Sequence, residues 1–269
     1  MRRPGRKSRP FEIHRVGISP RTAAAIRRAL LRWFKSSGRR FPWREEGTSL
    51  YERVLAEILL QRTRAQTVGA FFNEFTTRFP SWQAIADASI EQIGNCLKPI
   101  GLWRRRASSL AALAREMASR DGQFPHSREE IESLPAVGQY VASSILLFSG
   151  RKAEPLLDVN MARVLERLFG PRRLADLRDD PHLQSVSRVI IRGKHAAELN
   201  WALLDLAAML CTIKDPQCQQ CPLAGHCKYA NGRARQRSAC GLSLPHGKTT
   251  RQNEFRGGSE SEREAIFPP

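Results

Sequence analysis

Two carboxylates stand where the chain could use them for chemistry. Glu57 lies beside the apolar face of an amphipathic helical segment, residues 54–63. A carboxylate that borders a desolvated pocket has a raised pKa, which suits a general acid near neutral pH. Asp158 comes just before a stripe with helical spacing, so it is expected at a helix N-terminus. The alternative interpretations are an ordinary surface glutamate and a simple N-cap that accepts from the N–H of Asn160 or Met161.

A second group with chemical potential is an array of cysteines in a C-x6-C-x2-C-x5-C pattern, formed by Cys211, Cys218, Cys221 and Cys227. Disulfides are disfavoured in a reducing cytoplasm, and four thiolates in one short loop can converge on one metal centre. Zinc ribbons generally use two C-x2-C doublets, whereas this array has one doublet flanked by single cysteines. All-cysteine ligation of a [4Fe–4S] cluster therefore fits better, with zinc as the alternative. Cys96 and Cys240 are interpreted as spare thiols.

The segment 133–138 predicts a helix end and a tight turn. Pro135 fixes its own φ and lacks an N–H donor, and Gly138 permits a positive φ. The next helix is expected to begin at once, so that its free N–H groups and dipole form an anion site suited to a phosphate.

The run 98–106 places a glycine turn and Trp103 before three arginines, the first of which is Arg104. An aromatic wedge among cations is what base flipping requires, because the ring opens the base stack while arginines hold phosphates. The alternative is a packed tryptophan beside a solvated face.

The composition favours a polyanionic partner. Lys and Arg number 44 against 26 Asp and Glu, which gives a formal net charge of +18. No apolar run reaches the roughly 18–20 residues that span a bilayer, and the arginine-rich start lacks the core of a secretory signal. We therefore expect no membrane association and a cytoplasmic monomer, associated with the nucleoid if the source is bacterial.

Helical periodicity indicates an all-α protein. The first helix should run from Arg21 to a stop at 36–38, and residues 41–44 should form an extended anchor. Further helices are expected around 68–75, 85, 90–93, 110–117 and 186–191, and a buried one over 199–210 that leads into the cysteine loop. The basic arm, 1–20, and the tail, 231–269, are predicted to be disordered.

Together these motifs resemble a known family. The patterns L-P-x-V-G-x-x-x-A at 134–142 and L-D-x-N at 157–160, with the cysteine spacing, resemble the helix-hairpin-helix DNA glycosylases with an iron–sulfur cluster. That superfamily includes endonuclease III, the MutY-type adenine glycosylases and the T/G-mismatch thymine glycosylases. The resemblance covers about residues 21–230. The chain departs from the pattern at Ala136, usually glycine, and at Val141, usually threonine.

The resemblance implies two helical lobes with duplex DNA bound at their junction. One lobe would be a helical barrel, 45–158, that includes the hairpin, and the other would join 21–44 to 159–230 and hold a [4Fe–4S] cluster. Asp158 would be catalytic, and Glu57 matches the glutamate that protonates the purine in MutY-type enzymes. The DNA-binding residues implied are Gln61, Arg62, Trp103, Arg104, Val137, Gly138 and Gln139.

Position 140 separates the branches of this family. Bifunctional members carry a lysine there, whose amine forms a Schiff base with the sugar, whereas Tyr140 cannot. Tyr140 therefore indicates a monofunctional glycosylase, and tyrosine is typical of the T/G-mismatch thymine branch. We expect excision of thymine or uracil opposite guanine. Two alternatives stay open: an adenine glycosylase acting on A:G or A:8-oxoguanine, favoured by Glu57, and a non-catalytic DNA-binding module.

Overall fold

A computed structural model describes residues 17–232 of the chain. In that range the protein is helical and contains no strand, which confirms the all-α prediction. The α-helices are α1 (Pro20–Ser37), α2 (Leu50–Leu59), α3 (Ala65–Arg78), α4 (Trp82–Asp87), α5 (Ile90–Leu97), α6 (Trp103–Ala118), α7 (Arg128–Glu132), α8 (Gln139–Phe148), α9 (Val159–Phe169), α10 (Pro181–Ile191) and α11 (Ala196–Met209). Short 3-10 helices are η2 (Pro42–Arg44), η3 (Lys98–Ile100) and η4 (Ala224–His226).

Local sequence signals explain where the first helices begin. The Ser19 hydroxyl accepts from the N–H of Thr22, and Pro20 occupies the first turn of α1, as predicted for a helix in this region. Ser49 and Glu52 form a reciprocal capping box at the start of α2. The end of α2 was predicted too late, because the helix stops at Leu59 rather than continuing to residue 63.

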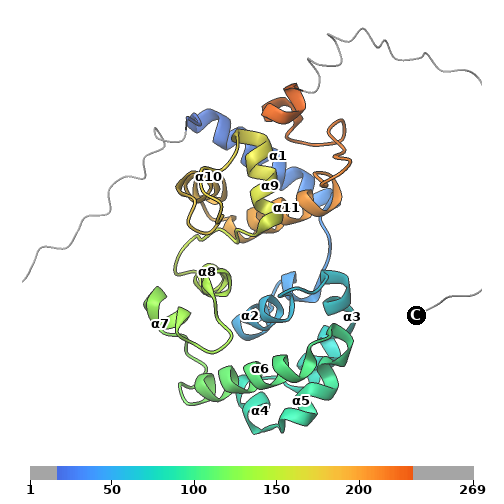
Figure 1. The fold of residues 1–269 in the computed structure, drawn as a ribbon, viewed down its shortest axis with the longest axis vertical. Helices are drawn as coiled ribbons and strands as arrows, with labels where there is room; N and C mark the ends of the chain where they lie inside the picture. Colours follow the sequence, from blue (N-terminus) through green and yellow to red (C-terminus); the bar gives the residue numbers. More distant parts are fainter. Residues whose placement is uncertain (1–16, 233–269) are drawn as a thin grey trace, which may run out of the picture.

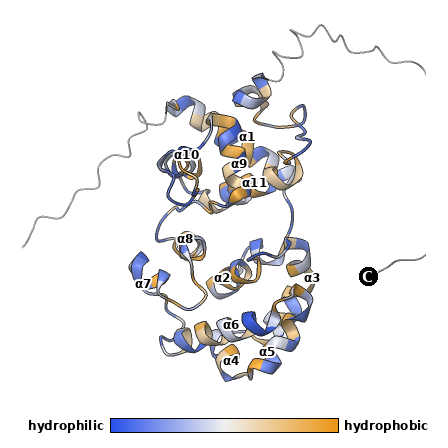
Figure 2. Ribbon diagram, in the orientation of Figure 1, coloured by the Kyte–Doolittle hydropathy of each residue, from blue (hydrophilic) through white to orange (hydrophobic). Residues whose placement is uncertain are grey.

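Two hydrophobic cores divide the helices into the two lobes seen in Figure 1. The first core is built by α2–α7 and most of α8, and the second by α1, α9, α10, α11 and part of the cysteine loop. Hydrophobic and hydrophilic residues alternate along the helices of both lobes (Figure 2). The first core begins at Phe41 and ends at Leu146, and Leu147 already belongs to the second. The change from the first core to the second thus falls within α8.

The predicted extended anchor at 41–44 instead contains the 3-10 turn η2. Its Trp43 is 2% exposed, stacks on Phe41 at a ring separation of 4.7 Å, and meets Phe72 edge-on at 5.2 Å. The two aromatic rings therefore fill the first core, and the backbone tightens to bring them together.

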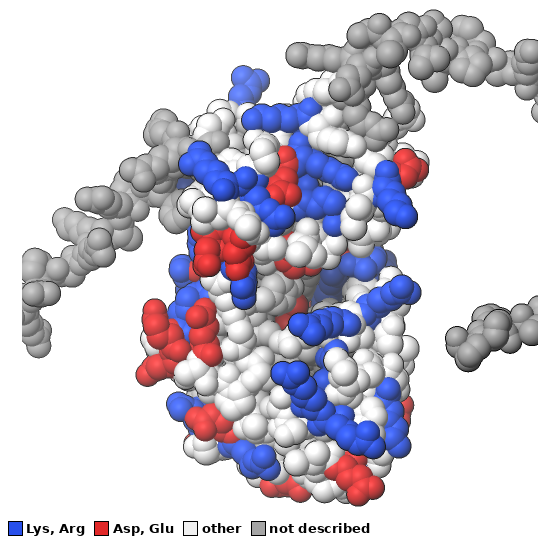
Figure 3. Space-filling view, viewed as in Figure 1, with Lys and Arg blue, Asp and Glu red and all other residues white. Residues whose placement is uncertain are grey.

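Lys and Arg side chains lie on both lobes and flank the region between them in the space-filling view (Figure 3). Most of the acidic side chains visible on this face lie toward its left edge in Figure 3. Within residues 17–232, no helix has both the length and the apolar character needed to cross a bilayer. Most of the predicted basic arm, nearly all of the predicted tail, and Cys240 lie outside the described residues.

Candidate active site

Glu57 is a buried carboxylate on α2. Only 4% of the residue is exposed, and every other buried residue of α2 is apolar. Burial raises the pKa of Glu57 to about 7, against smaller lowering effects from a Tyr140 hydrogen bond and the charge of Arg44. The raised pKa expected from the sequence is therefore present, and the surface-glutamate interpretation is wrong.

Tyr140 lies in the first turn of α8, directly after the hairpin. Its ring packs against both hydrophobic cores, and its hydroxyl donates to the Glu57 carboxylate. Burial and the nearby charges of Glu57 and Asp158 raise the pKa of the phenol well above its ordinary value. Tyr140 is therefore a neutral donor, and it joins the two lobes at this point.

Asp158 is the N-cap of α9. Its Oδ1 accepts from the N–H of Asn160 at 2.9 Å and of Met161 at 2.7 Å, while its Oδ2 accepts from Asn160 Nδ2 at 2.8 Å. The N-cap interpretation is thus confirmed. It does not exclude a chemical role, because the donors and the helix dipole compensate a negative charge at a fixed position.

One cavity of about 720 Å³ brings these three residues together. Glu57 comes from α2, Tyr140 from α8 and Asp158 from the start of α9, so both lobes supply its walls. Arg44 and Trp201 also line it. A space of this size and composition can enclose a flipped nucleoside, since ligand cavities generally measure about 300–1,000 Å³.

An interlobe ion pair beside the cavity was not anticipated from the sequence. Asp205 of α11 is fully buried and accepts from Arg44 Nη1 at 2.9 Å and from Arg39 Nε at 2.7 Å. The Arg44 guanidinium also lies 5.5 Å from the centre of the Trp201 ring. A lone aspartate inside the apolar run 199–210 was the available signal, because a buried carboxylate requires a cationic partner.

The hairpin adopts a different backbone from the predicted one. Gly138 has φ −99°, whereas Ala136 has φ +61° in the left-handed region. The strained position is therefore 136, where the family pattern usually has glycine. Alanine in this conformation costs about 1 kcal/mol relative to glycine. Val137 is buried and its N–H donates to Leu134 O at 3.1 Å, while Gly138 and Gln139 are exposed at the start of α8.

Gln61 and Arg62 lie in the exposed turn after α2. Gln61 Nε2 donates to Ala136 O of the hairpin at 3.3 Å, and Arg62 has φ +56°. Arg106 Nη2 donates to Gln61 O at 2.6 Å and to Thr63 Oγ1 at 2.9 Å, so it holds the shape of this turn. The third arginine of the run 104–106 thus has a structural task that the sequence analysis did not distinguish.

The turn before α6 exposes a leucine rather than the tryptophan. Leu102 has φ +48° and is 67% exposed. Trp103 is half-buried against α5, where a Cβ added at Gly94 would lie 2.8 Å from the ring. The packed interpretation of Trp103 is therefore confirmed. Arg104 is exposed and its guanidinium lies 4.3 Å from the Trp103 ring centre. A 330 Å³ groove places Leu102 beside Gln61, Arg62 and Arg105.

The four cysteines of the array line one small cavity, together with Arg167. Arg167 Nη1 donates to Cys211 Sγ at 3.3 Å, and burial with the neighbouring thiols raises the pKa of Cys221 to about 11. Every cysteine in residues 17–232 is a free thiol. Over the same range, no three acidic, histidine or cysteine side chains form a ready-made metal group. The side chains that line this cavity nevertheless include four cysteine thiols, and four thiolates are the ligand set of an iron–sulfur cluster.

The chain is similar to DNA repair enzymes. A family model described as HhH-GPD superfamily base excision DNA repair protein matches residues 55–179. A thymine/uracil-DNA glycosylase of Pyrobaculum aerophilum is 38% identical over 216 residues, covering 78% of this chain and 94% of the relative. An adenine DNA glycosylase of Mycobacterium tuberculosis is 33% identical over 196 residues, covering 72% and 64%. The solved structure of a thermostable thymine-DNA glycosylase matches with a TM-score of 0.70 and 26% identity, covering 78% and 97%.

Proposed function

The chain belongs to the HhH-GPD superfamily of base excision DNA repair proteins, and on that premise we propose that it is a monofunctional DNA glycosylase removing thymine or uracil opposite guanine. The observation that carries the proposal is the single cavity shared by Glu57, Tyr140 and Asp158. The similarity to a thymine/uracil-DNA glycosylase along 94% of that relative supports the choice of base.

Asp158 is the residue proposed to stabilise the reacting sugar. Breaking the N-glycosidic bond builds positive charge on the deoxyribose, and a carboxylate aimed at that charge lowers the barrier and orients the attacking water. The N–H groups of Asn160 and Met161 fix Asp158 Oδ1 and leave the carboxylate at the cavity wall. Its N-cap bonds therefore hold the carboxylate at one position, so that little reorganisation is needed during the reaction.

Glu57 is proposed to assist the leaving base. With a pKa near 7, a substantial fraction of the carboxyl groups carries a proton at neutral pH. A protonated Glu57 can donate to a carbonyl oxygen of thymine or uracil while negative charge develops on the departing ring. Tyr140 supplies a second neutral donor but no amine, so no Schiff base forms and the abasic strand stays intact.

The duplex is proposed to bind across the face where both lobes meet. The first turn of α8 offers backbone N–H groups beside exposed Gly138 and Gln139, and Arg62, Arg104 and Arg105 add positive charge. Leu102, rather than Trp103, is the exposed apolar side chain available to fill the stack after the base leaves it.

Cys211, Cys218, Cys221 and Cys227 are proposed to hold a [4Fe–4S] cluster. The support is that all four side chains line the same cavity and that Arg167 donates a hydrogen bond to the Cys211 sulfur. A bound cluster would cross-link the loop to itself and so stabilise the second lobe. The proposed catalytic residues Glu57, Tyr140 and Asp158 line a different cavity, so the proposed hydrolysis assigns no step to the cluster.

Adenine is the second candidate base, and one observation favours it. A glutamate with a pKa near 7 is also suited to protonate a purine ring nitrogen. The adenine glycosylase relative is 33% identical but is covered over only 64% of its length. The choice between the two bases therefore needs a direct assay.

The deciding experiment is single-turnover base release from matched duplexes that carry T:G, U:G, A:G or A:8-oxoguanine. Each reaction is read with and without alkali, which cuts an abasic strand. We expect release from T:G and U:G and strand breaks only after alkali. Release from the adenine duplexes alone would select the second candidate, and release from none would leave a DNA-binding module.

A further inference from the structure

The connector between α8 and α9 carries Asp158 at its end. Residues 154–157 of this connector are buried, and Leu156 and Leu157 pack into the second core, to which the end of α8 already belongs at Leu147. A segment that connects two helices ordinarily lies exposed on the surface. Its burial indicates that specific contacts hold it.

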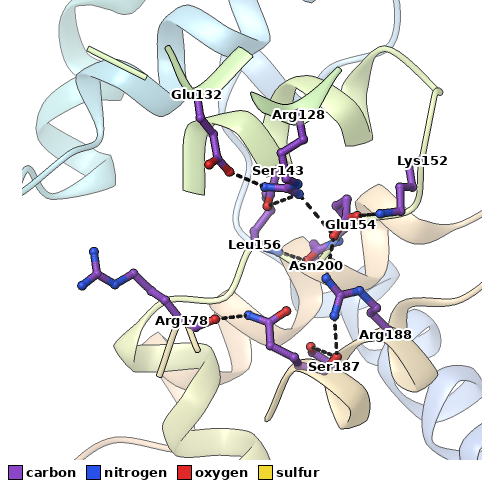
Figure 4. A network of polar contacts seen from close by, with 11 residues as sticks. Arg128, Glu132, Ser143, Lys152, Glu154, Leu156, Arg178, Ser187, Arg188 and Asn200 are labelled. Atoms are coloured by element: carbon purple, nitrogen blue, oxygen red, sulfur yellow. Dashed lines mark hydrogen bonds and ion pairs between the residues drawn. The ribbon is translucent and has the colours of Figure 1, made fainter. Parts of the chain in front are cut away.

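Glu154 is the charged residue of this buried stretch and is 1% exposed. Its carboxylate pairs with Arg128 Nη2 at 3.5 Å, with Arg188 Nη2 at 3.2 Å, and with Lys152 Nζ. Arg128 comes from α7, whose Ile131 is part of the first core, and Arg188 from α10 of the second lobe (Figure 4). One carboxylate therefore binds a cation from each lobe.

These contacts decide the charge of Glu154. Burial alone would raise its pKa, but the Lys152 hydrogen bond and the charges of Arg188, Lys152 and Arg128 bring the pKa below its ordinary value. The group is thus an anion that offsets three cations. Removing its charge would leave Arg128 and Arg188 to repel each other across the lobe boundary.

Asn200 of α11 holds the backbone on either side of Pro155. Its Nδ2 donates to Glu154 O at 3.2 Å and to Ala196 O at 2.8 Å, and its Oδ1 accepts from the N–H of Leu156 at 2.7 Å. Asn200 is fully buried, so water does not compete for these bonds. The path from Glu154 to Asp158 is therefore fixed at its first and third residues.

We propose that Glu154 is a positioning residue for Asp158, setting through Arg128 and Arg188 the relative placement of the two lobes. The inference rests on the proposed function, because its purpose is to bring Asp158 of one lobe opposite Glu57 of the other. A misplacement of about 1 Å can cost about 100-fold in rate. Glu154 itself does not line the cavity that holds the catalytic carboxylates.

The kinetic test compares Glu154→Gln with wild type on a T:G duplex. We expect the single-turnover rate at saturating enzyme to fall about 10- to 100-fold, with duplex affinity changed less than about threefold. Arg188→Gln removes only the ion pair between Glu154 and the second lobe. This variant replaces Glu154→Gln in the test if Glu154→Gln does not fold. The matched control is Glu132→Gln, which removes another partner of Arg128, at 2.9 Å, without crossing between lobes.

Hydrogen exchange gives a readout that does not depend on catalysis. The amide of Leu156 should exchange faster in Glu154→Gln and Arg188→Gln, but not in Glu132→Gln. A wild-type rate of base release in both Glu154→Gln and Arg188→Gln would overturn the inference. A slower base release that is accompanied by a comparable loss of duplex affinity and by a lower melting temperature would overturn it too. If wild type releases no base, the proposed function fails instead, and unchanged Leu156 exchange would still refute the positioning role.

Discussion

The hydroxyl of Tyr140 donates a hydrogen bond to the carboxylate of Glu57, joining α8 to α2 inside the cavity. This bond opposes the effect of burial, because it lowers the pKa of Glu57 while desolvation raises it. The balance leaves the carboxyl half-protonated near pH 7. Tyr140 therefore helps to set the protonation state of the proposed acid.

The first prediction concerns the pH dependence of base release. If protonated Glu57 donates to the leaving base, the single-turnover rate should fall as pH rises through about 7, the pKa of this group. Glu57→Gln should lower the rate and flatten this decline, since an amide does not titrate. Glu74→Gln, an exposed carboxylate of α3, is the control and should retain the wild-type profile.

The second prediction concerns stability and follows from the same pKa. Folding raises the pKa of Glu57 from 4.5 to about 7. The stabilising contribution of Glu57 to the free energy of unfolding is therefore fully present below pH 4.5 and is lost as pH rises through about 7. The loss amounts to about 3 kcal/mol at 1.4 kcal/mol per pKa unit. The free energy of unfolding of Glu57→Gln, relative to wild type, should rise by about this amount over the interval. A constant difference in denaturant titrations would contradict a buried, titrating Glu57.

The sequence predicted those parts of the fold that depend on local pattern. The start of α1 and the N-cap at Asp158 follow from a few neighbouring residues, and both are present. The carboxylate Glu57 could be identified because its helix has a strong apolar face. Features that depend on contacts between distant segments were missed, such as the pairing of Arg44 with Asp205.

Backbone detail was the other weakness of the sequence analysis. Glycine was taken to mark the positive φ of the hairpin, yet Ala136 adopts it and Gly138 does not. A non-glycine residue enters the left-handed region only where surrounding contacts compensate the strain. The Gln61 bond to Ala136 O is one such contact, and no local pattern could indicate it.

The third prediction concerns the cysteine loop. Anaerobically purified protein should be brown and contain about four irons and four sulfides per chain, as expected for one all-cysteine cluster. Cys218→Ser should lose colour and melt at lower temperature, because the cross-link within the second lobe is weakened. Cys96→Ser changes a cysteine of α5 in the other lobe and should keep both properties. Stoichiometric zinc without iron would show that the cluster assignment is wrong.

The fourth prediction concerns the DNA interface. Affinity for duplex DNA should fall with salt, and each phosphate contact adds about 0.9 to the slope of log affinity against log salt. Arg104→Ala and Arg105→Ala should each reduce the magnitude of this slope by about 0.9, the value of one phosphate contact. Arg115→Ala, an exposed arginine farther along α6, should leave it unchanged. Equal slopes in all three variants would place the duplex elsewhere.

The final prediction separates the two roles of Asp158. Asparagine is about as good an N-cap as aspartate, so Asp158→Asn should keep α9 and change the melting temperature little. The substitution removes the negative charge that faces the sugar, so single-turnover release should fall about 100- to 1,000-fold while mismatch affinity persists. Near wild-type release by a folded Asp158→Asn would mean that Asp158 only caps a helix. In that case Glu57 and Tyr140 would be the remaining groups of the cavity through which to seek the chemistry.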